Sequence, residues 1–166
     1  MKQILLFFSL IILSCAAGLS DDQRMFNTVN RVTYCVSELN YDCIDKLSAY
    51  DLSNNGNGGV KSQMKKAYYD MKKYHNNKVD SLIFKRDTVY DNLGRLKFTV
   101  YLFDGFDSLT GVTHSELQIF VGPKDMYSLD KISDLQYVDE IDVKYREYLL
   151  KQGKLLETDE LLKTIK

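Results

Sequence analysis

Two histidines and two aspartates are the side chains whose types could support proton transfer. His75 follows a lysine-rich segment and His114 opens a strand-like one, and neither has a serine, cysteine or acid pair beside it that forms a recognisable mechanism. Asp104 and Asp107 flank a glycine-containing turn, which is ordinary turn chemistry. The chain also lacks the G-x-S-x-G, H-E-x-x-H and glycine-rich phosphate-binding patterns. We therefore expect a protein that is not an enzyme and that needs no cofactor.

A segment rich in glycine and asparagine, residues 51–59, has some of the features of a calcium-binding loop. Oxygen-bearing side chains stand at Asp51, Ser53 and Asn55, and Gly56 occupies the position of the sharp turn. The twelfth position is Ser62 instead of the glutamate that would complete the coordination. Because few carboxylates would face a doubly charged ion, we expect a surface loop and no metal site.

A lysine-rich segment, residues 61–78, carries six lysines against a single acid, Asp70. Such a basic helix could contact anionic lipid headgroups, phosphates or an acidic partner. The alternative is an ordinary solvated helix face, which the five acids between residues 130 and 142 could neutralise within the molecule. The candidate patch for an anionic partner consists of Lys61, Lys65, Lys66, Lys72, Lys73 and Lys78.

The first twenty residues predict export. Lys2 precedes an apolar run over residues 4–13, which as a helix is about 15 Å long and too short to cross a bilayer. The run ends in Leu13-Ser14-Cys15, which resembles a bacterial lipobox. Residues 1–14 would then be a signal peptide, and residues 15–20 a lipidated N-terminus with a short linker. The alternatives are ordinary cleavage within residues 16–18, which releases a secreted protein, and an uncleaved anchor.

The other two cysteines, Cys35 and Cys43, are close enough in sequence to pair. Closing their nine-residue loop would stabilise the fold by about 2.5 kcal/mol on the chain-entropy estimate. An oxidising compartment favours this disulfide, and two buried thiols on neighbouring helices are the alternative. A zinc site is not expected, because two cysteines and two distant histidines lack the spacing of zinc ligands.

Hydrophobic periodicity predicts helices first and strands afterwards. A helix should begin after Ser20, as its N-cap, and end near Asn40. Asp42 should cap a short second helix, and apolar residues from Val60 to Tyr74 line one face of a third. Alternating residues then predict strands over 82–90, 96–103 and 116–121, and a shorter strand around 135–138. The tail, residues 143–166, should be helical and interrupted at Gly153.

This order predicts a single α+β domain over residues 21–142. Short turns between the strands imply a curved antiparallel meander of about four strands, with the N-terminal helices on one face and the C-terminal tail beyond. The inward side chains that can be named are wholly apolar, which favours a packed core over a pocket: Phe84, Leu96, Phe98, Val100, Leu117 and Ile119.

Three aromatic residues are expected on the opposite face of the sheet. If no helix covers Tyr101, Phe103 and Phe120, they form an exposed apolar patch and a candidate interface, most simply a homodimer interface. The alternative is that the C-terminal helices fold back over them.

The layout as a whole resembles the nuclear transport factor 2-like (cystatin-like) fold. The resemblance covers residues 22–140 in element order, including the segment from Glu38 to Tyr50 (ELNYDCIDKLSAY) between the first helix and the longer one. Small lipoproteins of Bacteroidota-type bacteria are similar in this layout, in a signal that ends in Leu-Ser-Cys, and in composition. None of the acid–base residues of enzymatic members has a matching position here, and the fold alone implies no activity.

Charge and composition narrow the function further. The 22 basic and 23 acidic residues nearly balance, which argues against a nucleic-acid binder. We expect a non-catalytic lipoprotein of the bacterial cell envelope, anchored through Cys15 to the outer membrane, that binds another protein or a small ligand. An enzyme or ligand carrier with a pocket between helices and sheet, or a freely secreted protein, is the alternative.

Overall fold

The computed structural model describes residues 19–49, 59–123, 128–156 and 158–165. Three helices come first: α2 (Asp21–Ser37), α3 (Tyr41–Leu47) and α4 (Gly59–His75). After the short 3₁₀ turn η1 (Val79–Ser81) follow four strands, β1 (Ile83–Arg86), β2 (Leu96–Asp104), β3 (Val112–Val121) and β4 (Ile132–Ile141). Two helices, α5 (Val143–Lys151) and α6 (Thr158–Thr164), end the described chain. The predicted α+β class and the order of helices before strands are confirmed.

Local capping explains where the first helices begin. The Ser20 hydroxyl accepts from the Gln23 backbone N–H, and the Gln23 side chain accepts from the Ser20 N–H, which forms the predicted start of α2 as a capping box. The cap of α3 differs from the prediction, because Asn40 takes this role and not Asp42. Leu39 has a left-handed φ of 50° that reverses the chain after α2, so Asn40 is the residue placed to accept from the Cys43 N–H.

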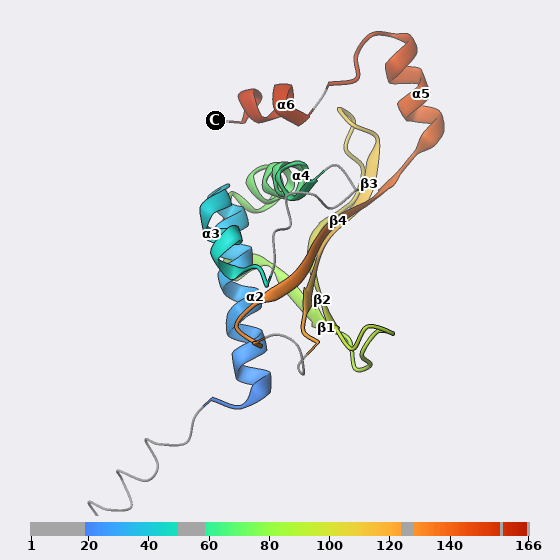
Figure 1. The fold of residues 1–166 in the computed structure, drawn as a ribbon. Coiled ribbons are helices and arrows are strands. Elements are labelled where there is room, and N and C mark those ends of the chain that lie inside the picture. The colour runs from blue at the N-terminus through green and yellow to red at the C-terminus, as the bar shows by residue number, and fades with distance from the viewer. Residues whose placement is uncertain (1–18, 50–58, 124–127, 157, 166) are drawn as a thin grey trace, which may run out of the picture.

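The four strands form one antiparallel sheet in the order β1-β2-β3-β4, as the predicted meander requires. Strand β1 is shorter than predicted because residues 87–95 fold into a loop around Asp91, whose carboxylate accepts from the N–H groups of Leu93 and Arg95. Strand β4 is longer than predicted, with ten residues, nine of which have a partner on β3. Figure 1 shows α2, α3 and α4 together on one side of the curved sheet.

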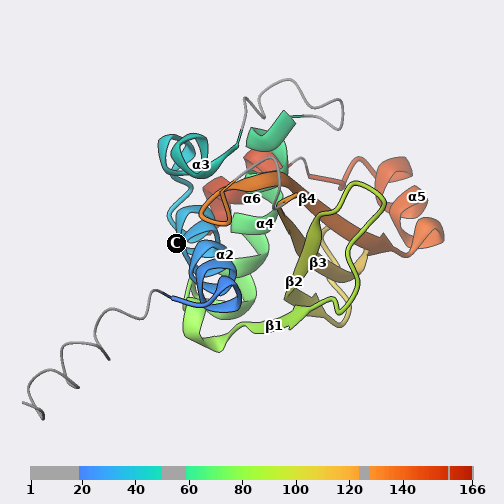
Figure 2. The ribbon, with the colours of Figure 1, turned by 60° about the horizontal axis from the view of Figure 1, so that its bottom comes forward.

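The hydrophobic core fills the layer between the three N-terminal helices and the sheet. It includes five of the six predicted inward residues, with Phe84 packed at its edge, as well as Met25, Val32, Ile44, Met64, Met71 and Ile132. Each fully buried aliphatic side chain contributes on the order of 1.5–3 kcal/mol. Figure 2 shows that α2 and α4 lie side by side under this layer, and that α5 lies at the far end of the molecule from α2.

Candidate functional site

The candidate site begins with one acidic residue on the apolar face of α4. Its buried neighbours on this helix are Val60, Met64, Ala67 and Met71, and Asp70 falls on the same face with 3% of its surface exposed. A carboxylate in such a layer needs hydrogen-bond partners, because an unpaired one costs several kcal/mol. The sheet supplies them.

Two hydroxyl groups from neighbouring strands donate to the same oxygen of Asp70. The Ser115 hydroxyl on β3 donates to Oδ2, and the Tyr137 hydroxyl on β4 donates to it over 2.9 Å. Burial raises the pKa of Asp70 to about 6, and the two hydrogen bonds, which favour the charged form, only partly oppose this shift. At pH 7.4 most Asp70 side chains are therefore ionised, although the residue is buried.

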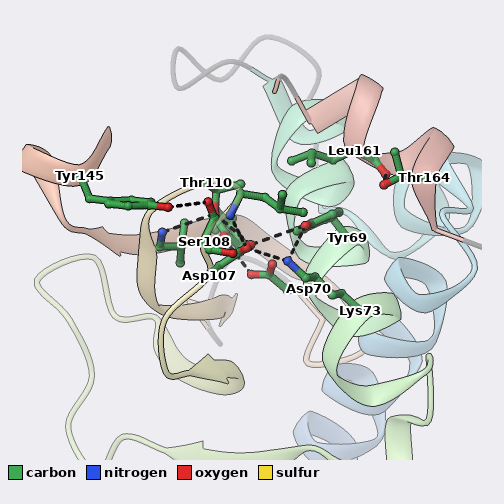
Figure 3. A network of polar contacts seen from close by, with 12 residues as sticks. Tyr69, Asp70, Lys73, Asp107, Ser108, Thr110, Tyr145, Leu161 and Thr164 are labelled. Carbon is green, nitrogen blue, oxygen red and sulfur yellow. Dashed lines mark hydrogen bonds and ion pairs between the residues drawn. The ribbon is translucent and has the colours of Figure 1, made fainter. Parts of the chain in front are cut away.

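An ion pair between a buried carboxylate and a partly exposed ammonium group lies beside Asp70. Asp107, in the turn between β2 and β3, is 4% exposed, and its Oδ1 lies 2.7 Å from Nζ of Lys73 on α4. The Thr110 hydroxyl and the Leu109 N–H also donate to Asp107. Burial raises the pKa of the Asp107 carboxyl, but the hydrogen bond from Lys73 and those from the turn outweigh it, so the pKa lies below its ordinary value. Figure 3 shows Asp70, Lys73 and Asp107 gathered in this network.

A partly open cavity of about 150 Å³ adjoins Asp70. Its walls come from α4, from the start of β3, from β4 and from the C-terminal segment. The lining residues are Lys66, Tyr69, Asp70, Thr110, Val112, Tyr137, Asp139, Arg146, Leu155, Leu156, Thr158 and Leu161. It therefore combines two carboxylates, two cationic side chains, two tyrosines and an apolar wall.

The C-terminal segment forms the apolar wall, through Leu155 and Leu156 before α6 and Leu161 within it. Leu161 is 2% exposed, and Lys65 on α4 pairs with Asp159 on α6 over 2.6 Å. Tyr145 of α5 donates to the Ser108 carbonyl, so the tail is also tied to the turn that holds Asp107 (Figure 3). The tail thus closes one side of the cavity.

The predicted lysine patch is largely engaged within the molecule. Lys65 pairs with Asp159 and Lys73 with Asp107, so the acids that neutralise them lie outside the expected 130–142 segment. The Lys61 and Lys66 ammonium groups lie over tyrosine rings, at 5.5 Å from Tyr41 and 5.6 Å from Tyr137. Within the described part of the chain, no ion pair involves Lys72 or Lys78. Two of the six lysines are thus neutralised by acids of the same molecule, and a basic patch for an anionic partner stays a prediction for the other four.

The three predicted interface aromatics do not form one exposed patch. A bulge in β2 between Tyr101 and Phe103 breaks the alternation, and Phe103 stacks on Tyr74 of α4 with ring centroids 3.9 Å apart, on the helix side of the sheet. Phe120 is only 8% exposed because the Arg95 guanidinium covers its ring. Tyr101 is half-buried, with its ring against His114. The expectation that all three lie on the face opposite the helices was wrong for Phe103, and Phe120 is covered by Arg95 and not by the C-terminal helices.

The remaining predicted residues lie away from the cavity or outside the described ranges. Cys35 and Cys43 form a disulfide that joins α2 to α3, with Cα atoms 5.7 Å apart. His75 contacts the Leu102 carbonyl through Nε2, and His114 lies 3.5 Å from Glu116. Cys15 and the candidate calcium loop around Asp51 to Asn57 lie outside the described residues.

Sequence reasoning missed the three residues at the centre of the site. Asp70 lies three residues after Ala67 and six after Met64, so helical spacing already placed a carboxylate on the apolar face. Ser115 precedes Leu117 by two residues and so falls on the inward period of its strand. The expectation of a wholly apolar inner layer was therefore incomplete, because Asp70, Ser115 and Tyr137 converge within it.

The described residues form no metal site and no membrane-spanning helix. In residues 19–49, 59–123, 128–156 and 158–165, no group of three or more histidine, cysteine, aspartate or glutamate side chains is placed to hold a metal ion. No helix in these same ranges has the length and apolar character needed to span a bilayer. Comparison with protein-family models, with curated proteins and with solved structures finds no match for this chain.

Proposed function

We propose that this protein is an exported, lipid-anchored binding protein of the bacterial cell envelope that holds a small ligand in the cavity beside Asp70. The single observation that carries the ligand-binding part is the placement of Asp70, which is 3% exposed, lines the cavity and is fixed by two hydroxyl groups from the sheet. An ionised carboxylate at such a place costs folding free energy. Features that lower the stability of the fold in this way are typical of functional sites, where binding or catalysis requires them.

The export part of the proposal rests on the N-terminal residues and on the disulfide. A disulfide between Cys35 and Cys43 suits an oxidising compartment outside the cytoplasm. The Leu13-Ser14-Cys15 segment supplies the lipidation site, and the short chain up to Ser20 links it to α2. More than one acyl chain gives stable anchoring.

Membrane fractionation and intact mass test the anchor. The native chain should be cleaved before Cys15, carry acyl chains and sediment with membranes, and Cys15→Ser should lose both the added mass and the membrane association. An unlipidated native chain in the soluble fraction would contradict lipid anchoring.

A two-dimensional NMR screen tests the cavity. The full chain, purified in mild detergent, is titrated with small amines, carboxylates, amino acids and alcohols at millimolar concentration. For at least one of these classes of compound, we expect saturable changes in the chemical shifts of cavity-lining residues. These changes should be absent in Leu156→Trp, whose larger side chain fills the cavity. Leu150→Trp, at a position 58% exposed on α5 and outside the cavity, is the matched control and should keep them. If no class gives saturable shifts there, ligand binding in this cavity is refuted.

A proton-transfer enzyme is the second candidate, because a cavity carboxyl with a pKa of about 6 can exchange protons near neutral pH. The two functions differ in what happens to the bound compound. After long incubation, a binding protein leaves the compound unchanged, whereas an enzyme converts it to a product. If the protein is an enzyme, Asp70→Asn should no longer form that product.

A further inference from the structure

The charges around the cavity are balanced in number but not in position. Its lining contains the carboxylates of Asp70 and Asp139 and the cationic groups of Lys66 and Arg146. The ammonium of Lys73, which acts electrostatically on Asp70, forms its ion pair with Asp107 instead, at 2.7 Å. Among the described residues no ion pair involves Asp70, whose two hydrogen-bond donors, Ser115 and Tyr137, are neutral hydroxyls. Asp70 therefore has two hydrogen bonds but no ion-pair partner of its own, since Lys73 acts on it only from a distance.

Lys66 and Asp70 are opposite charges one helical turn apart that do not meet. Positions i and i+4 of a helix lie on the same face, with Cβ atoms about 5–6 Å apart. Both residues line the cavity, yet the Lys66 ammonium lies over the ring of Tyr137 and no ion pair joins it to Asp70. Arg146, from α5, lines the same cavity and adds a second cationic group. A ligand that carries both charges a short distance apart would contact the two groups at once.

The rest of the lining fits the remainder of such a ligand. Tyr69 and Tyr137 offer aromatic walls, and ring faces favour contact with an ammonium group. Leu155, Leu156 and Leu161 form the apolar wall, where a small aliphatic group would be removed from water. The cavity of about 150 Å³ limits the ligand to a small molecule.

We propose that the ligand is a small zwitterion of the amino-acid type, whose ammonium group lies against Asp70, whose carboxylate lies against Lys66 and Arg146, and whose aliphatic side chain packs on the leucines of the C-terminal segment. This inference rests on the proposed ligand-binding function and adds the chemical class of the ligand. Each charged end of the ligand meets a group of opposite charge, which favours a compound that carries both charges.

Three compounds of one shape separate the contributions of the two charges. L-Leucine carries both charges, isoamylamine only the ammonium and 4-methylpentanoate only the carboxylate. Their dissociation constants are measured by NMR titration of the full chain in mild detergent at pH 7.4. We expect L-leucine to bind at least about tenfold more tightly than either single-charge compound, since each desolvated pair is worth more than about 1.4 kcal/mol.

Two charge-removing variants then assign the ends. Asp70→Asn should weaken the binding of L-leucine and isoamylamine at least about tenfold. The binding of 4-methylpentanoate should be unchanged or tighter. Lys66→Met should weaken the binding of L-leucine and 4-methylpentanoate and leave the binding of isoamylamine unchanged. Asp104→Asn, which removes an exposed carboxylate outside the cavity, is the matched control and should change none of the three. Lys66 is half-buried at the cavity rim, so Lys66→Met keeps the test valid even if Asp70→Asn fails to fold.

The outcomes separate this inference from the function on which it rests. If the three compounds and a neutral alcohol bind equally well, and Leu156→Trp abolishes the binding of all four, the cavity binds ligands but does not select a zwitterion. Tight L-leucine binding that Asp70→Asn leaves unchanged would also overturn the inference of a zwitterion. Absence of any saturable shift, with these compounds and with the wider screen, would overturn both.

Discussion

The hydroxyl of Tyr137 donates to the carboxylate of Asp70 over 2.9 Å and so joins the edge strand β4 to the apolar face of α4. The two residues are 67 positions apart in the chain, and Ser115 reaches the same oxygen from β3. Helix and sheet therefore meet at a polar contact inside an otherwise aliphatic layer. The stability and the binding properties of the protein both depend on this contact.

Replacement of Asp70 should stabilise the protein at neutral pH. The ordinary pKa of an aspartate is 3.8 and that of folded Asp70 is about 6, so the unfolded state loses its proton first as the pH rises. The wild type therefore loses stability between about pH 4 and pH 6, and the penalty stays constant above that window. Asp70→Asn, which still accepts both hydroxyl hydrogen bonds, should be roughly 1–3 kcal/mol more stable at pH 8.

Urea unfolding of both proteins between pH 3.5 and pH 8 checks this prediction. The advantage of Asp70→Asn should shrink to a few tenths of a kcal/mol near pH 3.5, where folded Asp70 is protonated and most of the unfolded carboxyls are too. A variant that is less stable than the wild type by the same amount at every pH would show that Asp70 contributes through packing and not through its charge.

The Lys73–Asp107 pair should be far more important for stability than the other lysines of α4. Lys73→Met leaves the buried Asp107 carboxylate without its ammonium partner and should cost about 2–4 kcal/mol. Lys72→Met, at the neighbouring position, should change the free energy of unfolding by less than about 0.5 kcal/mol. Chemical unfolding measures both, and the double variant Lys73→Met/Asp107→Asn should recover part of the loss. Equal effects of Lys72→Met and Lys73→Met would contradict a specific pair.

The disulfide between Cys35 and Cys43 should contribute about 2.5 kcal/mol, because it closes a short loop between α2 and α3. The double variant Cys35→Ala/Cys43→Ala should unfold at correspondingly lower denaturant concentration. Reduced wild-type protein is the control and should behave like the variant. If oxidised and reduced wild type unfold at the same concentration, the disulfide adds nothing to the fold.

Helix α6 should leave the cavity when its buried leucine is shortened. It has seven residues, too few for a helix that is stable by itself, and Leu161 is its buried contact. Leu161→Ala should therefore raise amide hydrogen exchange over residues 158–164 to nearly unprotected rates, while α4 keeps its protection. Leu150→Ala, on the exposed side of α5, should have no such effect. A parallel loss of protection in α4 would mean that α6 unfolds only with the whole domain.

Much of the fold follows from local sequence signals. Ser20 and Gln23 mark the start of α2 through a capping box that needs no tertiary contact. The alternation from Leu96 to Leu102 defines both β2 and its buried face, because side chains of a strand point to opposite sides in turn. The connections between successive strands hold nine, seven and ten residues, too few for the crossover that parallel neighbours need, so the antiparallel order follows from the strand positions.

The candidate site depends on contacts that local signals do not contain. The proximity of Tyr137 to Asp70 requires the register of β4 on β3 and the placement of α4 under the sheet. Asp70 lies in a lysine-rich segment, which drew attention to the lysines, although its own helical position favours burial. The inward turn of Phe103 results from a bulge, which shifts the alternation by one residue.

All that is proposed for the cavity requires that Asp70 be a buried carboxylate that ionises near neutral pH. Its ionisation can be followed by the chemical shift of its ¹³C-labelled side-chain carboxyl as the pH is varied, with exposed Asp104 in the same spectrum as an internal reference. We predict a pKa of about 6 for Asp70, rising further in Tyr137→Phe, which removes a hydrogen bond to the charged form. A pKa near 3.8 that Tyr137→Phe leaves unchanged would place Asp70 in water and contradict the site described here.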